Sequence, residues 1–198
     1  MTTENNVLMT QARGALEGKW GTAVIVTLIY MLCIGAIQAI PGLGQIAALI
    51  LAGPFALGYM IFALSLARKQ EADVSTLFSG FQNFGNAFVL YLLMVIFILL
   101  WTLLLIIPGI IAGFSYSMAY FILSENPDMK PMEAIDASKK MMYGYKMKLF
   151  FLYLRFIGWI LLSILTFGIG LLWVIPYIQV SLARFYDDIK DKPIPIEA

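Results

Sequence analysis

The sequence contains no histidine and a single cysteine, Cys33. Without histidine, the chain lacks the usual proton shuttle and the commonest metal ligand. It also cannot contain a His-bearing metalloprotease motif or a serine–histidine dyad. One cysteine cannot form an intramolecular disulfide. No glycine-rich phosphate-binding loop precedes a lysine. These absences predict no catalytic residue, no metal ligand and no cofactor, and we expect that the protein is not an enzyme.

Charged residues are also scarce. The 198 residues are 13% charged and 61% hydrophobic, with a mean hydropathy of +0.86, whereas soluble domains are about 25% charged and about 45–50% apolar. A soluble core could not bury this much apolar surface, so lipid must solvate much of it. The formal net charge of +1 gives no overall basic bias that would indicate a nucleic-acid partner.

Six apolar stretches predict an all-α polytopic membrane protein that forms a single integral-membrane domain over residues 1–198. A helix of about twenty residues is about 30 Å long, which matches the hydrocarbon core of a bilayer. The predicted transmembrane spans, followed by a short polar tail at 187–198, cover residues 21–40, 46–67, 87–107, 110–124, 149–165 and 170–186.

Turn residues join these spans into three helical hairpins. The turns fall at about 41–45, at Pro108-Gly109 and at 166–170, and none of them carries a charge. All acidic residues lie outside the spans, and the lysines and arginines of the connecting segments fall on the side opposite the turns. Because cytoplasmic loops are enriched in lysine and arginine, both termini are predicted to be cytoplasmic.

A short amphipathic segment precedes each hairpin. Before the third span, Asp73 is placed to cap a helix whose apolar residues share one face. Before the fifth span, Pro131 suits a first helical turn, and Asp136 and Lys140 form an i,i+4 pair. A weaker pattern precedes the first span. These segments are too short to cross a bilayer, and they predict helices that lie in the cytoplasmic interface.

Four lysines crowd ten residues beside the last of these amphipathic segments. They are Lys139, Lys140, Lys146 and Lys148. Near an anionic leaflet each lysine contributes about 1 kcal/mol of attraction, so they are candidates for contact with anionic lipid headgroups. The alternative is that they only establish the orientation of the chain.

Arg155 is the charge that lies deepest within a predicted span. It is about seven residues, or roughly 10 Å, into the fifth span. One interpretation is an intramembrane polar contact with a substrate or an anion. The alternatives are that its side chain snorkels to the cytoplasmic headgroups, or that it pairs with an acid at a helix end such as Glu125 or Asp187.

Pro54 and Pro176 interrupt the second and sixth spans. Each proline removes an amide donor and frees the carbonyl about four residues earlier. Broken helices line the sites of some transporters, so both prolines are candidate helix breaks. Prolines that merely kink a transmembrane helix are also common.

The second half of the chain resembles a known family. Leu77-Phe78-Ser79-Gly80-Phe81, Ile107-Pro108-Gly109-Ile110 and Gly168-Ile169-Gly170-Leu171-Leu172-Trp173 resemble the signatures of an uncharacterised bacterial integral-membrane family, domain of unknown function nine-seven-five. The resemblance covers about residues 7–188. It implies a six-helix protein of the bacterial plasma membrane, and it implies no activity and no catalytic residues.

The expected function is a non-enzymatic membrane scaffold. Its partners would be the lipid bilayer, anionic headgroups on the cytoplasmic side, and a partner membrane protein or a second copy of the chain. The alternative is a small transporter or channel that uses the helix breaks at Pro54 and Pro176.

Overall fold

The computed structural model describes residues 2–192, and every regular element in this range is helical. Ten α-helices and one 3-10 helix, η1, follow one another along the chain. Their bounds are α1 Asn5–Leu16, α2 Trp20–Gln38, α3 Gly44–Ala67, α4 Val74–Phe78, η1 Ser79–Asn83, α5 Phe84–Leu104, α6 Ile106–Tyr116, α7 Ala119–Glu125, α8 Pro131–Met141, α9 Lys146–Leu165 and α10 Leu171–Ile189.

Five stretches are long and apolar enough to cross a membrane. They are α2, α3, the continuous stretch Val74–Leu104, the stretch Ile106–Glu125, and α9. Helix α10, which contains the predicted sixth span, is not among them, and its last turns carry Arg184, Asp187 and Asp188. The all-helical class is therefore confirmed with five candidate spans, and the sixth span stays a prediction.

The turn of the second hairpin lies earlier than predicted. Helix α5 ends at Leu104, and the chain reverses at Leu105, whose backbone is extended (φ −160°, ψ 142°). Pro108 lies in the first turn of α6, where a missing amide removes no helical hydrogen bond. Gly109 packs against α5, because an added Cβ would lie 2.1 Å from Thr102 Oγ1. Pro108-Gly109 thus begins a helix and does not form the turn.

The predicted span 110–124 is two helices. Helix α6 ends at Tyr116 and α7 begins at Ala119, and the two turn residues between them, Ser117 and Met118, have backbone angles in the right-handed helical region. The buried hydroxyl of Ser138, on α8, donates to the carbonyl of Ser115 at 2.7 Å and accepts from the amide of Met118 at 3.2 Å. The break is therefore stabilised by α8, which is fixed against it.

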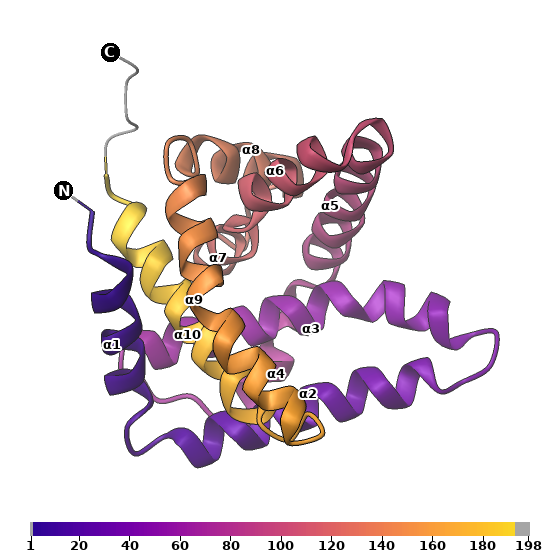
Figure 1. Cartoon of the computed structure of the whole chain (residues 1–198). Helices are drawn as coiled ribbons and strands as arrows, with labels where there is room; N and C mark the ends of the chain where they lie inside the picture. The colour runs from indigo at the N-terminus through magenta and orange to yellow at the C-terminus, as the bar shows by residue number, and fades with distance from the viewer. Residues whose placement is uncertain (1, 193–198) are drawn as a thin grey trace.

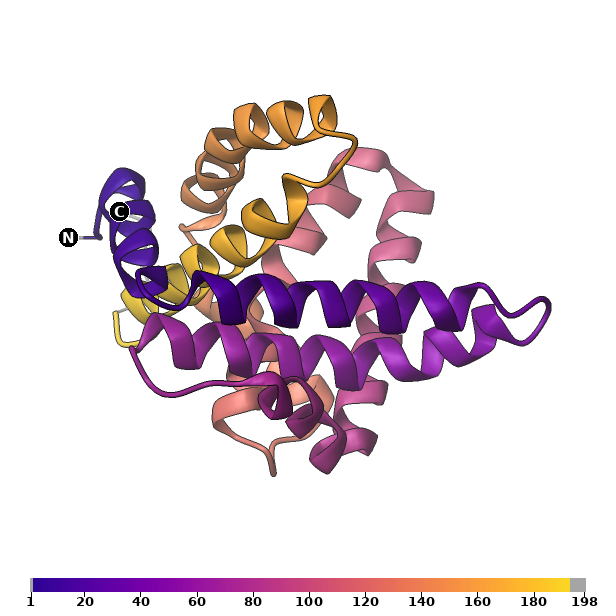
Figure 2. The ribbon, with the colours of Figure 1, turned by 90° about the horizontal axis from the view of Figure 1, so that it is seen from below.

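Three antiparallel helix pairs spread from one body (Figures 1 and 2). We call α2–α3, α5–α6 and α9–α10 the first, second and third pair, and their turns at residues 39–43, 105 and 166–170 the tips. In Figure 1 the three tips point in different directions, and in Figure 2 the tip of the first pair points away from the other two; in both views α1 and the end of α10 lie side by side. The three pairs are thus joined at the ends opposite their tips.

The buried core lies at this joined end. Its fully buried large side chains come mainly from α1, α3, α4, α7 and α10, and include Leu8, Leu16, Phe62, Leu66, Leu77, Phe121 and Phe185. The tips show the opposite pattern, since Leu103 is 83% exposed and Phe167 is 99% exposed. The molecule therefore presents large apolar surfaces at the tips, of a kind that soluble monomers rarely expose.

Three glycines allow the backbone of α3 to touch that of α4, η1 and α5. An added Cβ on Gly58 would lie 1.8 Å from the Leu77 carbonyl oxygen, and one on Gly53 would lie 2.3 Å from that of Ala87. An added Cβ on Gly80 would lie 2.1 Å from the Pro54 carbonyl oxygen. Backbone contact of this kind leaves no room for a side chain.

The two prolines do not end their helices. Helix α3 runs without interruption through Pro54, and α10 runs through Pro176. Both prolines are buried. The candidate helix breaks therefore lie inside continuous helices, packed against neighbouring elements.

A first ion-pair cluster joins α3, α7 and α10 at the joined end. The guanidinium of Arg68 donates to both carboxylate oxygens of Asp187, at 2.7 and 3.2 Å, and to Glu125. Glu125 also accepts from the Tyr186 hydroxyl at 2.5 Å and from Lys190 at 3.0 Å. One carboxylate on α7 thus has partners on α3 and α10.

A second cluster is centred on Asp188, whose side chain is only 8% exposed. It accepts from Lys148 at 2.5 Å, from Lys192 at 2.5 Å and from the Thr3 hydroxyl at 2.6 Å. Burial by itself raises the pKa of Asp188, but the hydrogen bonds from these three partners outweigh burial and lower that pKa below its ordinary value. The cluster ties α9 and the N-terminal segment to the end of α10.

Replacing Gly58 with alanine should destabilise the packing of α3. The new Cβ would overlap the Leu77 carbonyl, and overpacking typically costs about 1–3 kcal/mol. Thermal unfolding of the purified protein in detergent should therefore begin at lower temperature. Gly35→Ala is the control, because nothing lies within 4 Å of its added Cβ. Equal melting temperatures for the two variants would contradict this account of the contact.

Asp188→Asn should also lower the melting temperature. The control is Asp191→Asn, which should not lower it, because Asp191 is exposed and forms no ion pair in the described residues. Hydrogen bonds to charged groups contribute about 1.5–3 kcal/mol. Because folding lowers the pKa of Asp188, this stability is present above the ordinary aspartate pKa of about 3.9 and is lost as the pH falls. A difference between wild type and Asp188→Asn that persists unchanged in strong acid would contradict this assignment.

Candidate functional site

The structure separates the four clustered lysines. Lys148 is 15% exposed and is engaged with Asp188 in the second ion-pair cluster. Lys140 is exposed and does not line a described cavity. Lys139 and Lys146 instead lie together at one groove between α5, α6, α8 and the start of α9. Two of the four predicted lipid contacts therefore share a site.

One face of α6 forms the wall of this groove. Pro108, Ile111, Ala112 and Ser115 follow at the i, i+3, i+4 and i+7 spacing of a single helical face, and all four line the groove. Trp101 adds an indole from α5. The groove has a volume of about 400 Å³. Its wall is mostly apolar, because the Ser115 hydroxyl donates to the Ile111 carbonyl at 2.8 Å.

Lys139 has only weak partners at the groove. Its ammonium lies 5.6 Å from the centre of the Tyr116 ring, and 3.1 Å from Asp136. The predicted Asp136–Lys140 pair is therefore replaced by an Asp136–Lys139 pair at i,i+3. Both side chains are more than 40% exposed, and exposed pairs of this kind are weak. Lys139 is thus available to a stronger anionic partner.

Helix α8 places Lys139 at the groove. Pro131 occupies the first turn of α8, as predicted, and Glu133 accepts a hydrogen bond from the backbone amide of Lys130. Ser138 then fixes α8 to the break between α6 and α7. Because Lys139 directly follows this fully buried serine, its position depends on that contact.

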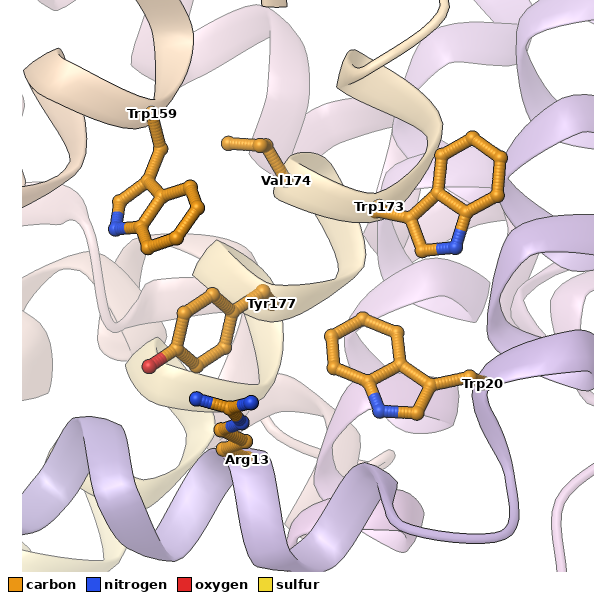
Figure 3. A pocket seen from close by; sticks show the side chains of 6 residues that line it. All are labelled: Arg13, Trp20, Trp159, Trp173, Val174 and Tyr177. Carbon is orange, nitrogen blue, oxygen red and sulfur yellow. The ribbon is translucent and has the colours of Figure 1, made fainter. Parts of the chain in front are cut away.

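A second cavity lies between α1, α2, α9 and α10 (Figure 3). It has a volume of about 260 Å³ and is lined by Arg13, Trp20, Trp159, Trp173, Val174 and Tyr177. Three of the four tryptophans of the chain thus surround one space. The Tyr177 hydroxyl donates to the Met9 carbonyl at 3.2 Å, which anchors α10 to α1. Arg13 supplies the only cationic group in this lining.

Arg155 does not pair with the acids proposed for it. Glu125 and Asp187 are both bound by Arg68. Arg155 is exposed on α9, and the described residues contain no ion pair to it. Trp159, which lines the second cavity, lies one turn later on the same face of α9. The structure therefore leaves snorkelling or an external anion as the two interpretations of Arg155.

Sequence patterns missed several residues of these sites. Arg13 and Trp20 precede the first span, and nothing in their spacing indicates contact with α10, which is more than 150 residues away in the chain. Ser138 lies within an amphipathic segment, where a serine is ordinarily solvent-exposed. For the α6 face the sequence does contain a pattern that could have indicated the groove wall, because small and apolar residues recur there at helical spacing.

Comparison with known proteins identifies the family. The family model described as "Protein of unknown function (DUF975)" matches residues 1–111 and 102–193. No curated protein and no solved structure matches the chain. The two matched segments overlap and together extend from the first residue to residue 193. The chain therefore belongs to the family of proteins of unknown function DUF975.

Proposed function

We propose that the protein is a non-enzymatic integral-membrane scaffold that binds anionic phospholipid in the groove along α6. The observation that carries this proposal is the arrangement of two lysines at the end of an otherwise apolar groove. An anionic phospholipid has the matching pattern of one charged head and long apolar chains. We place the protein in the bacterial plasma membrane, as the family resemblance implies.

The distribution of charge supports a single orientation in the membrane. Both ion-pair clusters lie where the helix pairs join, while the three tips carry no charged residue. With six spans, counting α10, the joined end and both termini face the cytoplasm. The exposed leucines, isoleucines and phenylalanine of the tips then contact lipid.

Three helices of the joined end fit the cytoplasmic headgroup layer. Helices α1, α4 and α8 are too short to span a bilayer, and each precedes one helix pair. The Asp73 carboxylate caps α4 by accepting from the amide of Ser75 at 2.9 Å, as predicted. Lying in this layer, α8 would hold Lys139 at the depth of the lipid phosphates.

The groove itself matches a lipid in polarity along its length. From Tyr116 to Pro108, the face of α6 extends about 12 Å at 1.5 Å per residue. Lys139 contacts Tyr116, at the end of α6 nearest α8, whereas Pro108 and Trp101 lie near the tip. A phosphate beside the lysines would therefore place its acyl chain along Ala112, Ile111 and Pro108.

Replacing both groove lysines should weaken binding of anionic lipid. In Lys139→Gln/Lys146→Gln, two attractions of about 1 kcal/mol each are lost, which corresponds to roughly 30-fold weaker affinity. Native mass spectrometry of the detergent-solubilised protein should show fewer retained phosphatidylglycerol molecules. Retention of the zwitterionic phosphatidylcholine should not change.

The matched control is Lys130→Gln/Lys140→Gln. These two lysines are exposed and do not line the groove, yet the variant has the same net charge as the test variant. It should retain phosphatidylglycerol as the wild type does. If both double variants lose lipid equally, the lysines act only through overall charge and the groove is not a binding site.

A further inference from the structure

A separate cleft lies between the first helix pair and α5. It has a volume of about 600 Å³, the largest of the described cavities. Tyr30 and Gln38 line it from α2, Gln45, Ala52 and Ala56 from α3, and Tyr91 from α5. The small residues of α3 thus form one wall, and they leave the space into which the polar side chains project.

The cleft extends from the tip of the first pair along α3 toward the joined end. Gln38 and Gln45 flank the tip of the first pair and are exposed. From Gln45 to Ala56 the cleft follows α3 for eleven residues, or about 16 Å. At its inner end the ring of Tyr30 stacks on that of Tyr59, with centroids 5.1 Å apart. Tyr59 in turn shares a 2.7 Å hydrogen bond with the buried Thr27.

The chemistry of the cleft differs from that of its surroundings. Its polar groups are two amides and two phenols, and no charged side chain lines it. Helices α2 and α3 are otherwise among the most apolar of the chain. Polar groups that face hydrocarbon without hydrogen bonds cost several kcal/mol in total. Water or a hydrogen-bonding molecule therefore satisfies the polar groups of the cleft better than acyl chains do.

We propose that this cleft binds a small uncharged molecule rich in hydrogen-bonding groups, such as a polyol. The amides at the mouth and the phenols at the inner end donate and accept without favouring either charge. The Tyr30–Tyr59 stack lies at the inner end, so in this proposal the molecule enters and leaves at the tip. The proposal rests on the membrane placement given above but not on lipid binding at the lysine groove.

Thiol labelling of Ala52→Cys tests the proposal. The protein is reconstituted in lipid nanodiscs with Cys33→Ala as background, and a charged, water-soluble maleimide reports access of water. Ala52→Cys should react at least tenfold faster than Leu32→Cys, which is 61% exposed on α2 but does not line the cleft. Sorbitol should slow the labelling of Ala52→Cys, and gluconate, an anion of similar size, should not.

Two results would overturn the proposal. If Ala52→Cys reacts no faster than Leu32→Cys, then lipid fills the cleft. If it reacts rapidly but sorbitol and gluconate have equal effects, the cleft holds water and has no preference for uncharged molecules.

Tyr91→Phe, which removes one lining hydroxyl, should reduce protection by sorbitol without changing the labelling rate in its absence. Neither outcome depends on lipid retention at Lys139 and Lys146, so failure here is distinguishable from failure of the lipid site.

Discussion

The end of α10 is the point on which the rest of the structure depends. Asp187 and Asp188 are consecutive residues, yet they bind different partners, Arg68 directly after α3 on one side and Lys148 of α9 on the other. The three helix pairs contact one another mainly at this joined end, and their tips diverge (Figures 1 and 2). Ion pairs and the buried core hold the pairs together at this end, so in the membrane placement that we propose lipid can enter between them at the other.

This arrangement explains why grooves rather than an enclosed cavity define the candidate sites. These spaces have walls from three or four helices each. The lysine groove combines cations from the joined end with an apolar face of α6, whereas the cleft beside α3 combines amides and phenols without charge. Differences in lining are therefore the reason why we propose different kinds of molecule for the two spaces.

Sequence patterns predicted the helices well and their contacts poorly. Long apolar runs, the cap at Asp73 and the proline at Pro131 have local causes, so the corresponding helices begin close to where they were expected. The turn at Leu105 and the break after Tyr116 were missed, because packing on Thr102 and on Ser138 determines them. Of the four clustered lysines, only the fold shows that Lys148 binds Asp188 while Lys139 and Lys146 face a groove.

The most direct test of the lipid-binding groove uses Trp101, which lies on its apolar wall. In a variant with phenylalanine at Trp20, Trp159 and Trp173, Trp101 is the sole tryptophan, and its fluorescence reports contact with brominated acyl chains in reconstituted bilayers. The lipid-binding account predicts stronger quenching by brominated phosphatidylglycerol than by brominated phosphatidylcholine at equal mole fraction, and loss of this preference in Lys139→Gln/Lys146→Gln. Equal quenching by the two lipids in the protein with both lysines intact would contradict it.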